Sequence, residues 1–418
     1  MTVGAKRVLF VSYGAGHIAM VLPVIRALKA QHPHWHIDLM ALTTGAHAAR
    51  AQGFECMRYR DFAHWYDADH LHRLAKPLLD GTTHPQVDAD ETLAYLGINM
   101  HDLAEQLGPS QALDEVKARG RWAFMPVKFM ERVLGHLQPD VLVTTNSPRS
   151  EQAAIEAARV LGIPSVCMVD LFSPPGDPFL ARSHYADALT TISELGRRNM
   201  VSGGIPGERI HVTGSPAFDG LFESSHRAQA ERDRAAMGWS KKKVILWAGH
   251  LELLPPGMGQ PDDPTEFPQH AEAALRAYVK AHDDVALIVR YHPNHAAHFR
   301  SSAQALAGQE RVLWSEASSR HVHRDIHLCD LAVIQATTVG LEVAIVGKSV
   351  LSLDHSPSRH VFPASDQGVS RGVASFAELP AALDAALTYP FKSELAQTEA
   401  AAAVAVAHVV QRMVGIAT

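Results

Sequence analysis

The stretch Arg7–Leu28 reads RVLFVSYGAGHIAMVLPVIRAL and decides the fold. Its first part, Arg7–Ser12, is a short run of β-branched and aromatic residues, which is typical of a buried strand. Behind the loop Tyr13–His17, apolar residues recur at spacings of three and four and predict a helix; they are Ile18, Val21, Leu22, Ile25 and Leu28. A strand, a glycine loop and a helix in this order form a ligand-binding layout.

The same alternation of short apolar runs and amphipathic helical stretches continues along the chain. It predicts an α/β fold in which parallel sheets are covered by helices on both faces. The expected strands are Arg7–Ser12, His36–Ala41, Val141–Thr145, Ser165–Val169, Ala188–Ile192, Ile210–Thr213, Lys243–Ala248, Val285–Arg290, Arg311–Trp314, Leu331–Gln335 and Ser349–Leu353. Two Rossmann-like, doubly wound domains in series explain this series better than one large sheet.

Breaks in the alternation suggest where the domains begin and end. Pro216 and a charged stretch mark Ser215–Lys243 as the linker region. We therefore expect an N-terminal domain of residues 1–222, a C-terminal domain of residues 223–395 and a final segment, 396–418, that contains an alanine-rich helix. Residues 61–140 carry helical patterns, at Glu91–Leu107 and Leu113–Leu137, and are predicted to be a helical insertion in the first domain.

Composition narrows the class of protein. The 418 residues carry a formal net charge of −6, with 47% hydrophobic and 20% charged residues, which is the balance of a folded globular protein. The mild acidity disfavours nucleic acid as a partner. No apolar run reaches the roughly 18 residues of a membrane span, so we expect no transmembrane segment, although contact with a membrane surface stays compatible with the sequence.

Cysteine usage and the start of the chain indicate a cytoplasmic location. The three cysteines, Cys56, Cys167 and Cys329, are far apart and offer neither a disulfide framework nor a CxxC metal site. The apolar run Val8–Val11 is too short for the core of a signal peptide. The His-rich stretch around Asp67–His72 lacks a metal-binding spacing and is interpreted as solvated surface, so no metal is expected.

The first candidate site is the loop around Gly14, Gly16 and His17. Glycines let the backbone approach a ligand closely, and the following helix offers free N–H groups. His17 is then placed to take a proton from an attacking hydroxyl. The alternative is a tight βα turn with His17 as a cap. Asp170, which follows the strand Ser165–Val169, is a second candidate for the base.

The second candidate site comes from the C-terminal half, in QATTVGLE at Gln335–Glu342. Thr337 and Thr338 stand where a helix starts, so their hydroxyls and the helix N–H groups are suited to a diphosphate. Glu342 is suited to accept hydrogen bonds from ribose hydroxyls, because a Glu among apolar residues needs a partner. The alternative is an ordinary Thr cap with an acidic residue near the helix N-terminus.

Two further groups follow strands of the same half. Arg290 and His292, in RYHPN, come at the end of a predicted strand, where an anionic group of a ligand would bind in a doubly wound sheet. Gly249 and His250 repeat the layout of the first loop after the strand Lys243–Ala248. Each group also fits an ordinary turn. A GxSxG elbow and a Walker A motif are both absent from the sequence, which disfavours a serine hydrolase and an ATPase.

Taken together, these motifs resemble the GT-B superfamily of nucleotide-sugar enzymes, in the branch that holds UDP-N-acetylglucosamine 2-epimerases, lipid-A-disaccharide synthase and the N-acetylglucosaminyl transferase of peptidoglycan synthesis. The stretches that carry the resemblance are GAGH at Gly14–His17, PDVLVTTNS at Pro139–Ser147, IHVTGSPAFDGL at Ile210–Leu221, RYHPN at Arg290–Asn294 and ATTVGLEVAIVGKSVLSL at Ala336–Leu353. The resemblance implies a nucleotide-sugar donor in the C-terminal domain, an acceptor against the N-terminal domain, catalysis in a cleft between them, and a final helix packed back on the first domain.

Departures from the epimerase pattern bear on the reaction. The Arg and Lys of the epimerase loop and helix fall here on Ala15 and Met20, and the carboxylate after the PDVLV-like strand falls on Asn146. In the same resemblance, a second acidic position is kept as Asp170, and the histidine of the epimerases' HRREN-like stretch is matched by His250. Epimerisation needs acid and base groups on both faces of the sugar, so a lost carboxylate weakens that interpretation.

The sequence therefore predicts a glycosyltransferase that moves a sugar from a nucleotide diphosphate sugar, most simply a UDP-sugar, to an unidentified hydroxyl acceptor. Transfer is expected to invert the anomeric centre and to need neither a metal nor another cofactor, with His17 or Asp170 as the base. One alternative is an isomerase or hydrolase like the UDP-N-acetylglucosamine 2-epimerases. A second alternative is a sugar-nucleotide binder without activity.

Overall fold

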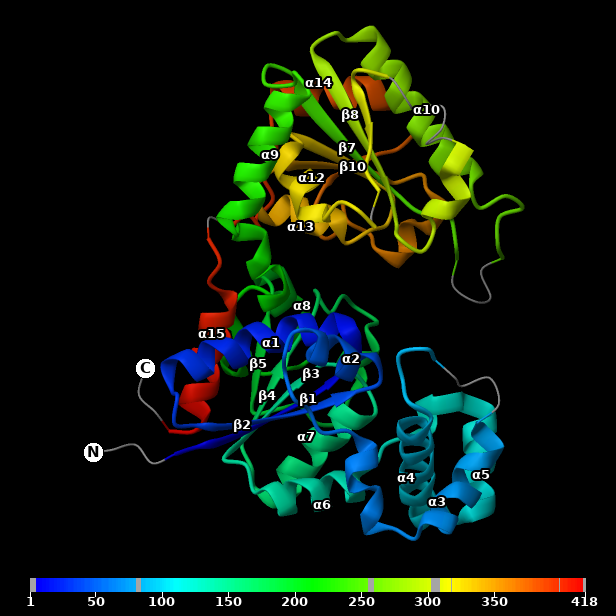
Figure 1. The fold of residues 1–418 in the computed structure, drawn as a ribbon, viewed down its shortest axis with the longest axis vertical. Coiled ribbons are helices and arrows are strands. Elements are labelled where there is room, and N and C mark those ends of the chain that lie inside the picture. The colour runs from blue at the N-terminus through cyan, green and yellow to red at the C-terminus, as the bar shows by residue number, and fades with distance from the viewer. Residues whose placement is uncertain are drawn as a thin grey trace. The chain divides into compact units, whose positions relative to one another are not determined.

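The computed structural model describes residues 5–79, 84–254, 259–301, 309–316, 318–397 and 399–415. The chain forms two compact units, one of Met1–Asp219 with Ala401–Thr418 and one of Gly220–Ala400. Each unit is built on a six-stranded parallel sheet flanked by helices (Figure 1). The predicted pair of Rossmann-like, doubly wound sheets is confirmed.

The first sheet has the strand order β2-β1-β3-β4-β5-β6. Its strands are β1 (Arg7–Tyr13), β2 (His36–Leu42), β3 (Val141–Thr145), β4 (Ser165–Met168), β5 (Ala188–Thr191) and β6 (Ile210–Val212). Phe10 of β1 pairs with Leu39 on one side and with Val143 on the other. The order reverses beside β1, because β2 lies on one side of it and every later strand lies on the other.

Helices cover both faces of the first sheet, and α3 and α5 pack on α4 beside it. The helices of the first unit are α1 (Gly14–Gln31), α2 (Thr44–Ala51), α3 (Ala68–Ala75), α4 (Ala89–Leu107), α5 (Pro109–Arg119), α6 (Val127–Leu137), α7 (Ser150–Leu161), α8 (Glu194–Ser202) and α15 (Ala402–Met413). Val8 and Phe10 of β1 belong to the apolar core formed with α1 and α15. The alternate residues Leu9 and Val11 belong to the core formed with α4, α6 and α7. This alternation is the two-residue period of a strand buried on both faces.

Residues 61–140 are mainly helical, as the sequence patterns indicate, but Leu113–Leu137 is not one continuous helix. Helix α5 ends at Arg119, and Gly120 follows with a φ of +59°. A short 3₁₀ turn, Gly120–Ala123, then leads to Pro126, and α6 begins at Val127. The glycine accepts the left-handed conformation and the proline lacks a backbone N–H, so together they divide the stretch into two helices.

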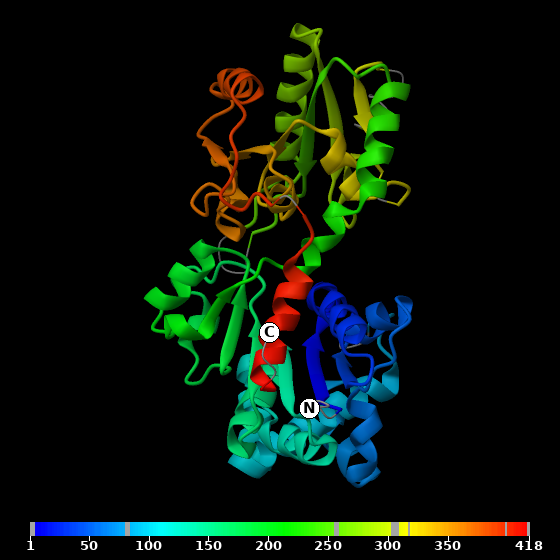
Figure 2. The same cartoon turned by 90° about the vertical axis from the view of Figure 1, so that its left-hand side faces the viewer.

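The C-terminal helix α15 packs against α1, and the two helices lie side by side in both views (Figures 1 and 2). Its apolar face, which includes Val406 and Val410, is fully buried in the core of the first unit. Asp219, the last residue of the first segment of this unit, caps the N-terminus of α15. Its carboxylate accepts the N–H groups of Ala402 at 3.2 Å and Ala403 at 2.8 Å. The first unit is therefore assembled from two distant parts of the chain.

The second sheet has the strand order β12-β11-β10-β7-β8-β9. Its strands are β7 (Lys243–Gly249), β8 (Val285–Tyr291), β9 (Val312–Trp314), β10 (Leu331–Ile334), β11 (Ser349–Leu353) and β12 (Arg371–Val373), and its helices are α9 (Ser224–Ala236), α10 (Glu266–Ala281), α12 (Val322–Leu328), α13 (Val339–Ile345) and α14 (Leu379–Thr388). This is the Rossmann strand order, with its reversal between β7 and β10. None of the helices in the described ranges is long and apolar enough to cross a membrane.

The predicted linker region Ser215–Lys243 contains the change from one unit to the other, at Asp219 and Gly220, and it also contains α9. Its charged residues have partners within the second unit. The carboxylate of Asp233 on α9 lies 2.9 Å from an Nη of Arg320, which just precedes α12, and 2.5 Å from an Nη of Arg324, which lies on α12. These ion pairs hold the pKa of Asp233 at about 2, against a counteracting effect of burial. The charged stretch is therefore the paired face of a helix.

Replacement of Val406 by Ala should lower the free energy of unfolding of the first unit by about 2 kcal/mol, because two buried methyl groups are lost and a cavity remains. Val404 lies on the same helix but is 42% exposed, so Val404→Ala is the matched control and should have little effect. Urea unfolding of the full chain measures both. Equal effects of the two substitutions would contradict the packing of α15.

Candidate active site

The first cluster of chemical groups lies at the carboxyl ends of β1, β3 and β4. His17 is in the first turn of α1, Thr145 is the last residue of β3, and Asp170 follows β4. Carboxyl ends of parallel strands share one edge of the sheet, and ligands bind in such sheets where the strand order reverses. That reversal occurs beside β1, so the predicted catalytic residues His17 and Asp170 are brought together at this point.

His17 contacts three side chains there. Its Nδ1 lies 2.7 Å from the hydroxyl of Thr145 and 3.9 Å from a carboxylate oxygen of Glu151. Its Nε2 lies 3.5 Å from a carboxylate oxygen of Asp170. Glu151 is completely buried, whereas 21% of the His17 side chain and 35% of the Asp170 side chain are exposed. His17 and Asp170 can therefore reach a ligand, and Glu151 cannot.

Glu151 is the component of the site that the sequence analysis missed. In the sequence it looks like an acidic residue in the first turn of a helix, which the helix dipole favours. In the structure its carboxylate accepts the N–H of Tyr13 at 2.9 Å and the hydroxyl of Thr145. The sequence signal for this role is weak: Glu151 stands six residues after Thr145, the last residue of β3.

The two carboxylates determine the charge of His17. Burial by itself lowers the pKa of His17, but hydrogen bonding and charge attraction to Asp170 and Glu151 outweigh it and raise the pKa to about 10. Burial likewise raises the pKa of Asp170, and the neighbouring imidazolium outweighs that effect and holds the pKa below its usual range. At neutral pH the site therefore contains a protonated histidine beside an ionised aspartate.

This charge state bears on the expected role of His17 as the base that deprotonates an acceptor. An imidazolium with a pKa of about 10 has no free lone pair at neutral pH, so it is an acid in the ligand-free protein. Asp170 is the available base. Its backbone N–H is held by the side-chain oxygen of Asn146 at 3.3 Å, so Asn146 positions the loop that carries the carboxylate.

The two loop glycines have different conformations. Gly14 has a φ of +76°, in the left-handed region that residues with a side chain rarely adopt. Gly16 has no positive φ, and a Cβ added there would meet no atom within 4 Å. The space above Gly16 is open, which is the condition for a ligand to approach this part of the backbone.

The second cluster is a pocket of about 130 Å³ at the carboxyl ends of β7 and β8 and the start of α13. Four of the predicted binding residues line it: Gly249, Arg290, His292 and Thr337. Val322 and Val339 add apolar surface. His250, Thr338 and Glu342 are described residues that do not line the pocket. Of the seven binding residues predicted in this unit, four therefore line the same pocket.

His250 is occupied by a backbone contact. Its Nδ1 lies 2.7 Å from the carbonyl oxygen of Leu251, and its Nε2 lies 3.3 Å from the N–H of Ala336. A carbonyl only accepts and an N–H only donates, so Nδ1 carries the proton and the ring is neutral. The backbone N–H of His250 also donates to the side-chain oxygen of Gln335 at 3.0 Å. His250 therefore joins the loops after β7 and β10 beside the pocket.

A buried carboxylate supports the same loops. Glu252 is almost fully buried and accepts hydrogen bonds from Gln335, from the hydroxyl of Ser356 at 2.6 Å and from the N–H of Ser358 at 2.8 Å. Three donors on one carboxylate compensate for much of the cost of burying the charge. Glu252 thereby orders Gln335, which in turn holds His250.

Arg290 lines the pocket, but its positive charge is paired with the carboxylate of Asp325. Its Nη1 donates to Ser315 at 2.8 Å and to the carbonyl of Arg320 at 2.9 Å, and lies 3.1 Å from the buried carboxylate of Asp325. This ion pair fixes the guanidinium by one nitrogen. Arg290 is thus a positioned donor with a paired charge rather than a free cation.

Thr337, Thr338 and Glu342 occupy different surroundings. The hydroxyl of Thr337 accepts the N–H of Val339 at 3.4 Å, a cap-like contact at the start of α13, while Thr338 is exposed. Burial raises the pKa of Glu342 to about 7, and one of its oxygens lies 3.6 Å from Nε2 of His323. The partner that a buried Glu342 needs is therefore supplied by α12.

The two Rossmann-like units give the chain the GT-B fold. Solved UDP-N-acetylglucosamine 2-epimerases have the same fold. The enzyme from Methanocaldococcus jannaschii is 13% identical, with a TM-score of 0.60 over 97% of this chain and 99% of that one. The enzyme from Neisseria meningitidis, bound to UDP-N-acetylglucosamine, is 14% identical, with a TM-score of 0.56 over 97% and 100%.

A third similar structure is S. aureus MnaA with UDP, at 13% identity and a TM-score of 0.57 over 99% of this chain and 98% of that one. No protein-family model matches the sequence, and no curated protein sequence matches it. At such low identity the likeness establishes the fold, and the chemistry has to be argued from the residues of this chain.

Replacement of His17 by Gln should change how stability depends on pH. Because the pKa of His17 is raised from 6.5 to about 10 on folding, its contribution is complete below pH 6.5 and is lost as the pH rises through about 10. The wild type should therefore lose stability between pH 7 and pH 10 more steeply than H17Q. Urea unfolding at several pH values measures this slope, and parallel profiles would contradict the charged state of His17.

Proposed function

We propose that this protein is a nucleotide-diphosphate-sugar enzyme that moves protons at the sugar, in the manner of a 2-epimerase. The observation that carries the proposal is the paired His17 and Asp170, one protonated and one ionised, 3.5 Å apart on exposed parts of the same edge. Elimination followed by re-addition needs a resident acid as well as a base. Transfer to a hydroxyl needs only a base, because a nucleoside diphosphate is a good leaving group.

In this reaction the carboxylate of Asp170 takes the proton from C2 of the sugar. The C1–O bond breaks, its electron pair leaves on the diphosphate, and a C1=C2 double bond forms. The diphosphate then adds back to C1 while the imidazolium of His17 supplies a proton to C2. Inversion at C2 requires delivery on the opposite face, so substrate binding must separate the two side chains from their ligand-free distance of 3.5 Å.

The pocket of the second unit supports the nucleotide part of the proposal. It lies where the strand order of the second sheet reverses, and its lining combines apolar side chains with donors from Arg290, His292 and Thr337. The similar solved structures contain UDP or UDP-N-acetylglucosamine. We therefore propose a UDP-sugar as the ligand, with its nucleotide held by this pocket of the second unit.

Glycosyl transfer to a hydroxyl acceptor is the second candidate, and two observations favour it. Met20 of α1 stands where the epimerase pattern has a cation, and its side chain is buried in the apolar core. The charge that the epimerase pattern has at this position is therefore absent. The closeness of His17 and Asp170 also suits proton transfer on a single side of the sugar. In that case Asp170 is the base for the acceptor, and His17 holds its charge and orientation.

A single experiment with UDP-N-acetylglucosamine in D₂O distinguishes the two proposed activities. An epimerase should exchange the C2 hydrogen for deuterium and form the C2 epimer without any acceptor, as followed by NMR. Asp170→Asn should lower this rate by about 10²- to 10⁴-fold, the usual effect of removing a general base. Asp177→Asn is the matched control, since Asp177 only caps a nearby turn through Phe179. Consumption of donor only after an acceptor is added would instead indicate the transferase.

Filling the pocket of the second unit should weaken nucleotide binding. Val339→Phe places a ring into a volume of about 130 Å³, and we expect the affinity for UDP to fall at least about tenfold, or 1.4 kcal/mol. Val361→Phe, at an exposed position of the same unit, is the control and should leave binding unchanged. Isothermal titration calorimetry measures both variants, and unaltered affinity in Val339→Phe would place the nucleotide elsewhere.

A further inference from the structure

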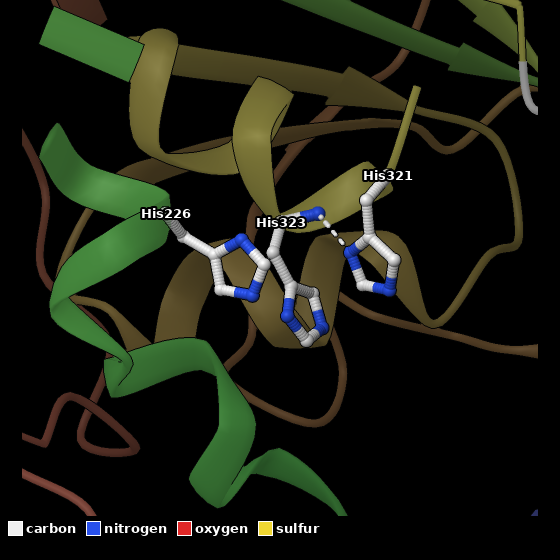
Figure 3. A group of neighbouring side chains, drawn as sticks. All are labelled: His226, His321 and His323. Atoms are coloured by element: carbon white, nitrogen blue, oxygen red, sulfur yellow. Dashed lines mark hydrogen bonds between the residues drawn. The ribbon is translucent and has the colours of Figure 1, made fainter. Parts of the chain in front are cut away.

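Three histidines of the second unit gather beside the pocket. His226 comes from α9, His321 immediately precedes α12, and His323 lies within it (Figure 3). Each offers one ring nitrogen, and the three nitrogens lie within 4.8 Å of one another. The ring centroids are 4.3 Å apart for His321 and His323, and 5.0 Å apart for His226 and His323. Residues about one hundred positions apart in the sequence therefore converge on one point.

Contacts within the cluster do not occupy all of the ring nitrogens. Nδ1 of His321 accepts the backbone N–H of His323 at 3.3 Å, which leaves its Nε2 unused by that contact. Nδ1 of His323 is shielded from solvent and makes no hydrogen bond of normal geometry. A neutral imidazole keeps a lone pair on one nitrogen, and Nε2 of His323, which faces Glu342, is the nitrogen that this ring can offer to an ion shared with Glu342.

Two carboxylates border the cluster. An oxygen of Glu342 lies 3.6 Å from Nε2 of His323, and an oxygen of Glu223 lies 3.7 Å from Nε2 of His226. The Glu342 side chain is mostly buried, whereas Glu223 is mostly exposed. Glu342 is therefore the carboxylate that is enclosed with the rings, and it is available to them because it does not line the nucleotide pocket.

We propose that His226, His321 and His323, with Glu342 as the fourth ligand, bind one divalent transition-metal ion of the zinc type. Imidazole nitrogen and carboxylate oxygen are zinc ligands, and four protein ligands make a closed site. A tetrahedral ion with bonds of about 2.0–2.1 Å sets its ligand nitrogens about 3.3 Å apart. The rings therefore need to close by rotation from a separation of up to 4.8 Å.

The donor set also selects the class of ion. Three imidazoles suit zinc, cobalt, nickel and copper, whereas magnesium and calcium prefer oxygen ligands throughout. The ion would join α9, α12 and α13 at the edge of the pocket, because Val322, between two of the ligands, is part of the pocket lining. Its role is to fix these helices beside the ligand site, and the proposal does not depend on which reaction the enzyme carries out.

The test uses the full chain, freed of any affinity tag and dialysed against a chelator. Titration with Co²⁺ should produce the visible absorption of a tetrahedral site with one ion per chain, and Zn²⁺ should displace it. His226→Gln and His321→Gln should each weaken Zn²⁺ binding at least tenfold in calorimetry. Thermal melting in the presence of chelator verifies that each variant is folded, and added Zn²⁺ should raise the melting temperature of the wild type but not that of these two variants.

A matched control comes from the first unit. His70 and His101 also form a close histidine pair, with Nε2 and Nδ1 3.2 Å apart, but they are not part of a described group of three ligands. His70→Gln should bind Zn²⁺ as tightly as the wild type. The proposal is overturned if the wild type binds no ion at one equivalent, or if the folded His226→Gln and His321→Gln variants bind Zn²⁺ as tightly as the wild type.

Discussion

A single buried carboxylate, that of Glu151, connects the elements on which the candidate active site depends. It accepts the N–H of Tyr13 at the end of β1 and the hydroxyl of Thr145 at the end of β3, and it extends from the first turn of α7. A charge without access to water is stable only with such donors. Its third neighbour is His17, so the contact that joins the sheet to α7 also keeps the histidine protonated.

Much of the fold was predictable because buried parallel strands have a strong sequence signal. Every expected strand occurs in the structure within one residue at each end. β12 was missed because Arg371–Val373 has only three residues and contains Gly372, so it has no apolar run to recognise. The helix α9 was missed because it buries little apolar surface, and its Asp233 is paired with Arg320, just before α12, and Arg324, on α12, which no local pattern reveals.

The sequence predicts where the residues of the candidate site lie better than it predicts their protonation states. Residues that follow strands converge at the sheet edge, which is why His17 meets Asp170 and why Gly249, Arg290 and Thr337 share a pocket. Protonation states, in contrast, depend on neighbours that come from other elements. The charge of His17 depends on Asp170 and on Glu151, and Glu342 lies beside His323 of α12.

The position of α15 has a consequence for the order in which the protein forms during synthesis. The second unit is one continuous segment, Gly220–Ala400, and its sheet is complete before α15 leaves the ribosome. The first unit has most of its residues at the beginning of the chain, but the side of α1 that packs on α15 has no cover until residues 402–413 emerge. The nascent chain therefore carries an unfinished first unit, with an exposed apolar face, throughout the synthesis of the second.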